Sequence, residues 1–150
     1  MKRLLTASIL SLLLAGTAFA QVTVSDPWVR ATVAAQKASG AFMTLTATRD
    51  TRLVAARSPV AGVVEIHTMA LENNVMRMRA IDALALPAGK AVKLESGGYH
   101  LMLMQLKGPL TAGETVSLEL VFEHSDQSRE TVRINAEVRA LTSGHGTMKH

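Results

Sequence analysis

The chain has 150 residues, of which 16 are Lys or Arg, 12 are Asp or Glu and none is Cys. The absence of thiols excludes zinc–thiolate sites, iron–sulfur clusters, thiol catalysis and blue-copper centres. The net charge of +4 is small and only 3% of the residues are aromatic, so the composition argues against nucleic-acid binding.

The first twenty residues have the three parts of a secretory signal peptide. Lys2 and Arg3 precede an apolar run over residues 4–14, and Ala18-Phe19-Ala20 forms a small-x-small cleavage site. The apolar run is shorter than the roughly 20 residues that span a bilayer. We therefore expect cleavage after Ala20, export to the periplasm, and a mature chain that begins at Gln21 and contains no membrane span.

The mature chain is predicted to be all-β and to form one domain over residues 21–141. Short segments rich in Val, Leu, Ile and Thr alternate with turn residues, which is typical of a β-sandwich or barrel. The expected strands cover residues 42–48, 53–56, 63–69, 75–81, 92–95, 99–106, 115–123 and 131–138. Residues 142–150 lack apolar periodicity and are expected to form a flexible tail.

Methionine and histidine gather in three of the expected strands. The clusters contain His67 and Met69, then Met76 and Met78, then His100, Met102 and Met104. Because side chains alternate along a strand, the members of each cluster share one face. A two-residue turn that pairs Leu71 with Asn74 would place His67 directly opposite Met78, whereas a three-residue turn would place Met78 on the other face.

Two imidazoles and two thioethers form a soft, neutral ligand set. Thioether sulfur suits Cu(I), whereas zinc sites favour Cys, His and carboxylates. Either residue type also has a purely structural interpretation, because Met often fills cores and a His on an apolar face often has a backbone partner. The joint spacing of the four residues favours a metal site.

The spacing H-x10-M-x21-H-x-M, formed by His67, Met78, His100 and Met102, resembles the signature of the periplasmic copper chaperone family PCu(A)C. The surrounding segments 40–42, 65–69 and 97–104 are also similar, and the resemblance covers roughly residues 22–138. It implies a cupredoxin-like Greek-key β-barrel that binds one Cu(I) at these four positions. The implied role is delivery of copper to the CuA centre of cytochrome c oxidase, directly or with a Sco-type protein.

A binding and transfer protein is therefore the leading hypothesis, and no enzymatic activity is expected, because no catalytic triad or carboxylate pair accompanies the cluster. The alternatives are a periplasmic copper storage or resistance protein and a metal-free β-sandwich interaction domain. In the second of these, the methionines would belong to the core.

Other residues have weaker expectations. Met69, Met76 and Met104 are expected mainly to pack in the core, with additional thioethers around the site as the alternative. His124 is expected to be a solvated turn residue. The tail residues His145, Met148 and His150 form a second candidate metal site, and the family resemblance implies Cu(II) as its ion.

Overall fold

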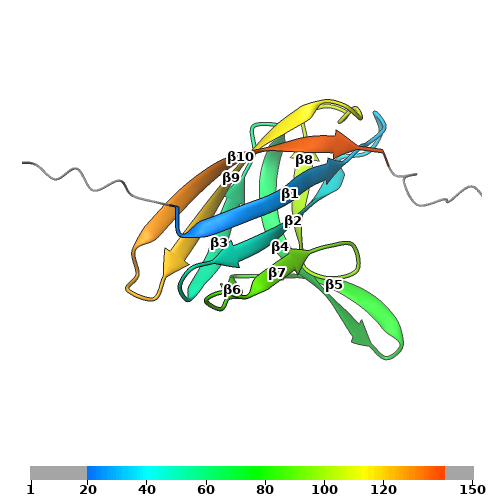
Figure 1. Ribbon diagram of the computed structural model, residues 1–150. Helices are drawn as coiled ribbons and strands as arrows, with labels where there is room; N and C mark the ends of the chain where they lie inside the picture. Colours follow the sequence, from blue (N-terminus) through cyan, green and yellow to red (C-terminus); the bar gives the residue numbers. More distant parts are fainter. Residues whose placement is uncertain (1–19, 141–150) are drawn as a thin grey trace, which may run out of the picture.

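The computed structural model describes residues 20–140, which form ten β-strands in one sheet and no helix (Figure 1). The strands are β1 (Val22–Arg30), β2 (Ala38–Ala47), β3 (Thr51–Arg57), β4 (Ala61–Glu72), β5 (Val75–Ile81), β6 (Leu84–Leu86), β7 (Ala91–Leu94), β8 (His100–Leu106), β9 (Thr115–His124) and β10 (Arg129–Arg139). The predicted all-β class is confirmed, and each of the eight expected segments corresponds to a strand.

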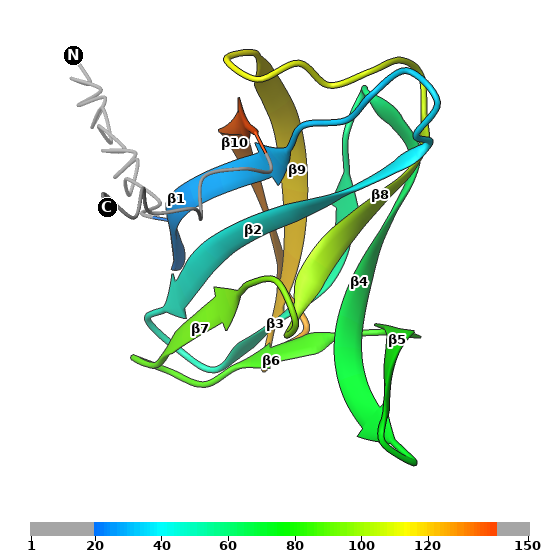
Figure 2. The ribbon, with the colours of Figure 1, turned by 90° about the vertical axis from the view of Figure 1, so that its right-hand side faces the viewer.

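The sheet has the order β5-β4-β8-β2-β1-β10-β9-β3-β6, and β7 pairs with the end of β2 that β8 leaves free. The β1–β10 pair is parallel, and the other pairs are antiparallel. Figure 2 shows how the sheet curls on itself into a barrel, from which the β4–β5 hairpin projects.

The interior of the barrel is aliphatic. Its largest fully buried side chains include Phe122, Leu45, Leu53, Leu86, Leu101, Leu103, Leu118 and Leu120. The period of two is clearest over residues 100–104 of β8, where Leu101 and Leu103 belong to this core and the alternate residues do not. The His and Met positions of β8 therefore lie on the outer face of the sheet.

The sequence analysis missed β1 because this strand is interrupted. Its register with β2 shifts between Ser25 and Trp28, and Asp26 there has a φ of 48°. Pro27 lacks an N–H for the ladder and is tolerated at such a bulge. Beyond the bulge, Trp28 pairs with Phe42 of β2, and their ring centroids are 4.6 Å apart.

The turn of the β4–β5 hairpin differs by one residue from the expected one. Glu72 pairs with Val75, so Asn73 and Asn74 form the two-residue turn, with φ angles of 49° and 62°. A turn with two positive φ angles matches the twist of a hairpin, and Asn tolerates this conformation far better than Glu. The Leu71–Asn74 pairing, one of the two registers that the sequence left open, is therefore not formed.

This register changes the partner of His67. His67 lies opposite Ala80, and Met78 lies opposite Met69. Because the shift moves the pairing by two residues, Met78 remains on the same face as His67, one step further along the hairpin.

Two expectations concern residues outside the described range. The expected signal peptide covers residues 1–20, all but the last of which lie outside the described range. The second candidate metal site consists of His145, Met148 and His150, which also lie outside it. Within residues 20–140, no helix is long and apolar enough to cross a membrane.

Candidate metal centre

His67 and His100 face each other across two neighbouring strands. They are direct partners in the antiparallel pairing of β4 and β8, and their ring centroids are 5.6 Å apart at an angle of 63°. Both residues are buried, with 9% and 6% of their surface exposed. The structure thus brings together two residues that are 33 positions apart in the sequence.

Each imidazole has one nitrogen occupied by a protein acceptor. Nδ1 of His100 lies 3.0 Å from the carbonyl oxygen of Gly98, which can only accept, so this nitrogen carries the proton. Nε2 of His67 lies 2.7 Å from Oε2 of Glu65, and it donates to that carboxylate. In the neutral rings, Nε2 of His100 and Nδ1 of His67 are therefore the unprotonated nitrogens.

The free nitrogen of His67 is the unusual one. Its Nδ1 is the buried side-chain nitrogen or oxygen that has no hydrogen-bond partner among the described residues. Leaving such an atom unpaired costs about 1–3 kcal/mol, and buried polar atoms in native proteins rarely lack a partner. A metal ion is one partner that an unprotonated imidazole nitrogen can take.

Burial also lowers the pKa of His100 from its usual 6.5. Loss of water around the ring is the largest cause, and the positive charges of His67 and Arg30 act in the same direction. The hydrogen bond to Gly98 opposes these effects. The net result favours the neutral ring, which is the form that binds metals.

The expected methionines lie beside this pair. Met78, Met102 and His100 line one cavity of about 230 Å³. Met102 pairs with Glu65 of β4 and Gly40 of β2, which places it on the same face as the two histidines. The four predicted ligands thus gather on one outer face of the sheet, supplied by β4, β5 and β8.

The site is closed on the β2 side by Phe42. This ring is buried, lies 6.4 Å from the ring of His100, and is covered by the guanidinium of Arg30 at 5.2 Å. The Phe42 ring can lie here because residue 40 is a glycine: a Cβ at Gly40 would lie 2.7 Å from Cζ of Phe42. Phe42 thus limits access of water to one side of His100.

The additional methionines do not belong to the core, so the expected core role is wrong for them. Met69 is partly buried and lines the same cavity as Met78. Met76 is 51% exposed on the hairpin, and Met104 is partly buried opposite Val63. Met43 is the methionine that packs in the core.

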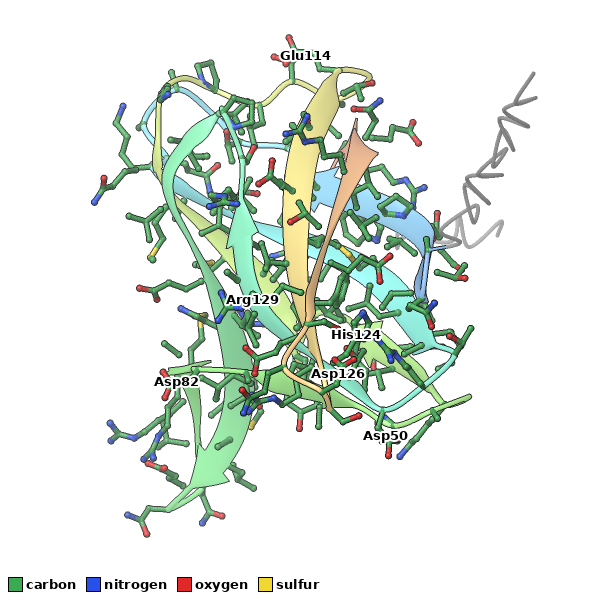
Figure 3. All side chains as sticks on the ribbon, turned by 90° about the vertical axis from the view of Figure 1, so that its left-hand side faces the viewer. Asp50, Asp82, Glu114, His124, Asp126 and Arg129 are labelled. Atoms are coloured by element: carbon green, nitrogen blue, oxygen red, sulfur yellow. The ribbon has the colours of Figure 1, made fainter. Side chains whose placement is uncertain are left out.

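His124 is also not the solvated turn residue that the sequence suggested. It ends β9 and is 5% exposed. Figure 3 labels it close to Asp126 of the turn that follows. Its Nδ1 lies 2.8 Å from Oγ1 of Thr51, and its Nε2 lies 3.2 Å from Oε2 of Glu130. Both nitrogens have protein partners, so this histidine has a structural environment unlike that of His67.

Sequence reasoning overlooked Glu65 and assigned Met69 mainly to the core, although a signal was present. Both lie two residues from His67 on β4 and hence on its face of the sheet. Within residues 20–140, no three His, Cys, Asp or Glu side chains form a metal-binding group.

Comparisons with known proteins fit this arrangement. Residues 22–138 match the model of the family described as "Putative lipoprotein LpqE-like". The chain belongs to the LpqE-like family. A relative in this range, "Putative lipoprotein Lxx21020" of Leifsonia xyli subsp. xyli, is 34% identical over 114 residues, which cover 75% of this chain and 68% of the relative.

Solved structures similar to this LpqE-like chain include PCuAC domains. The copper-bound PCuAC domain from PmoF2 has a TM-score of 0.64 and 25% identity, covering 82% of this chain and 96% of that domain. Apo-DR1885 from Deinococcus radiodurans has a TM-score of 0.60 and 30% identity, covering 97% and 98%. The predicted cupredoxin-like barrel is therefore confirmed.

Proposed function

We propose that this protein is a copper chaperone of the periplasm that holds one Cu(I) through His67, Met78, His100 and Met102. The observation that carries the proposal is the orphaned Nδ1 of His67, which is buried beside the His100 ring and has no hydrogen-bond partner within residues 20–140. Copper is the cargo of such a protein and not a resident cofactor.

The donor set fits Cu(I) better than other common ions. Thioethers are soft ligands that favour Cu(I), and imidazole nitrogens bind copper readily. All four ligands are neutral, so a bound Cu(I) keeps one positive charge, which is less costly to bury than two. The solved Cu(I)-bound form of DR1885, which is 28% identical to this chain, supports the same ion.

The proposal also includes delivery of the bound Cu(I) to an acceptor protein. A Met/His site holds Cu(I) less tightly than thiolates do, so transfer to a Cys-containing acceptor is downhill. Met78 is 46% exposed, which gives an acceptor access to one ligand. The CuA centre of cytochrome c oxidase, reached directly or through a Sco-type protein, is the acceptor that we propose.

Titration with Cu(I) under anaerobic conditions tests the binding step. We expect one Cu(I) per chain at the site, and Zn(II) should not displace it. A chain that binds no Cu(I) would leave the metal-free interaction domain as the better interpretation. The single-site capacity would also argue against storage.

Transfer is tested separately, by mixing the Cu(I)-loaded protein with a reduced dithiol acceptor domain and following copper in each. We expect movement to the acceptor within minutes. Retention of copper, with an acceptor that still takes up free Cu(I), would favour a storage or resistance protein.

A second site in the tail is part of the proposal, with His145, Met148 and His150 as ligands for Cu(II). Three donors in a short segment can bind a metal, as short His-rich tracts do. A variant that ends at residue 140 should lose a Cu(II) equivalent and keep the Cu(I) equivalent. Equal Cu(II) binding by both forms would remove the tail site.

A further inference from the structure

Met69 stands out because it has the position of a ligand without belonging to the expected ligand set. It follows His67 by two residues on β4, so the two side chains share a face. It is the direct cross-strand partner of Met78, and both line the cavity that contains His100 and Met102. It is also partly buried, unlike Met76 at the exposed end of the hairpin.

The pairing brings the two thioethers within reach of one point. Directly paired residues on adjacent strands have Cβ atoms about 4.5–5.5 Å apart. A methionine side chain has three rotatable bonds beyond its backbone, so its sulfur adapts to irregular sites. Sulfur atoms from Met69 and Met78 can therefore occupy the same position near the two histidines, one at a time.

The two methionines differ in their access to solvent. Met78 belongs to β5, an edge strand of the projecting hairpin in which six of the seven residues are exposed (Figure 2). Met69 belongs to β4, which pairs with β8 up to His67 and is anchored there in the barrel. An incoming acceptor meets Met78 first, and Met69 stays behind it.

We propose that Met69 is an exchange ligand that takes the place of Met78 on the copper ion when Met78 turns away. This inference rests on the proposed Cu(I) site and adds a fifth donor to it. Replacement of one thioether by another breaks one Cu–S bond and forms one. The number of sulfur ligands is therefore the same before and after the exchange, and no electron is transferred. The hairpin face is then the side on which copper enters and leaves.

The sulfur content of the Cu(I) site in Met78→Leu tests this proposal directly. X-ray absorption spectroscopy of the Cu(I)-loaded wild type should give two sulfur neighbours, from Met78 and Met102. Met78→Leu should still give two, because Met69 replaces the missing thioether, and Met69→Leu/Met78→Leu should give one. One sulfur neighbour in Met78→Leu itself would overturn the proposal.

Affinities measured by competition with a Cu(I) chelator provide an independent readout. Because each thioether substitutes for the other, each single variant should weaken binding by about tenfold or less, and the double variant by more than the product of the two effects. Met104→Leu, which alters a partly buried thioether on the β8 side, is the matched control and should bind as the wild type does.

The outcomes separate this inference from the proposed function. A wild type that binds no Cu(I) refutes both. A wild type that binds Cu(I), together with a double variant no weaker than Met78→Leu, refutes the exchange ligand and leaves the four-ligand site intact. Circular dichroism of each variant shows whether the fold is retained.

Discussion

Nδ1 of His67 is buried and has no hydrogen-bond partner in the part of the chain that the structure describes, and the centroid of its ring lies 5.6 Å from that of His100. The nitrogen of His100 that does not bond to Gly98 is Nε2. The acceptors that fix these tautomers are Glu65, on the same strand as His67, and Gly98, two residues before His100. In known metal sites, the ring nitrogen that does not bind the metal commonly donates to a carboxylate or a backbone carbonyl in this way, and this hydrogen bond orients the imidazole. In the neutral rings, these hydrogen bonds leave Nδ1 of His67 and Nε2 of His100 as the nitrogens that can bind a metal.

Substitution of His67 should affect copper binding and not folding. His67→Asn removes the orphaned nitrogen, so we expect Cu(I) affinity to fall by at least about tenfold while the free energy of unfolding stays constant or rises. Chelator competition and chemical denaturation measure the two quantities.

His124→Asn is the matched control for this prediction. His124 is equally buried but bonds to Thr51 and Glu130. Its loss should lower the free energy of unfolding by about 1–3 kcal/mol and leave the Cu(I) affinity unchanged. The reverse result, with copper binding lost only in His124→Asn, would place the site elsewhere.

The sequence predicted the ligand-bearing strands well because their pattern has a clear physical basis. The eight segments that were expected to be strands are strands in the structure, and the His and Met positions of β4 and β8 lie on one face of the sheet. The pairing of His67 with His100 was not predictable in this way. It depends on β4 and β8 being neighbours, which is a property of the sheet order and not of either segment.

Three errors show what local patterns leave out. The β4–β5 turn was placed one residue early because the αL preference of Asn73-Asn74 was not weighed against Glu72. His124 was assigned to a solvated turn because its neighbours Ser125 and Asp126 are polar, whereas Thr51 and Glu130 enclose it from other strands. Strand β1 was missed because Asp26 and Pro27 interrupt its pattern.

The lowered pKa of His100 predicts that mild acid destabilises the copper-free protein. The unfolded chain binds a proton at His100 near pH 6.5, but the folded protein does so only at a lower pH, because burial opposes the charge. Between these two values the unfolded state binds more protons, so the free energy of unfolding falls as the pH decreases below 6.5.

Because a single proton is involved, the free energy of unfolding changes by at most about 1.4 kcal/mol per pH unit. Chemical denaturation of the wild type and His100→Asn at several pH values measures it, and the variant should lack this contribution. Parallel pH profiles for the two proteins would show that His100 does not titrate in this way.

Gly40 should be required for the shape of the site. A Cβ in Gly40→Ala would meet Cζ of Phe42 at 2.7 Å, so Phe42 must move, and with it the packing around His100 and Trp28. We expect a loss of about 1–3 kcal/mol in the free energy of unfolding, together with weaker Cu(I) binding. Gly108→Ala, where a Cβ would meet nothing within 4 Å, should change stability by less than about 0.5 kcal/mol and leave copper binding unaltered.

The start of the mature chain gives the last prediction. The backbone nitrogen of Gln21 lies 3.0 and 3.2 Å from the two carboxylate oxygens of Glu130, which also accepts a hydrogen bond from His124. Cleavage after Ala20 would convert this nitrogen into a charged amino group, and charge-assisted hydrogen bonds are stronger than neutral ones. Mass spectrometry of the periplasmic protein should therefore find a chain that begins at Gln21.

In that mature form, Glu130→Gln removes the carboxylate beside the new amino group. It should lower the free energy of unfolding by about 1.5–3 kcal/mol, because a charged donor then loses its charged acceptor in a partly buried position. Glu137→Gln is the control, because the Glu137 side chain is 61% exposed and its ion pair with Arg139 lies at the surface, so its effect should stay below about 0.5 kcal/mol. A mature chain that retains residues 4–14 would refute the cleavage. Equal stabilities of the two variants would instead show that Glu130 contributes no more than a surface carboxylate.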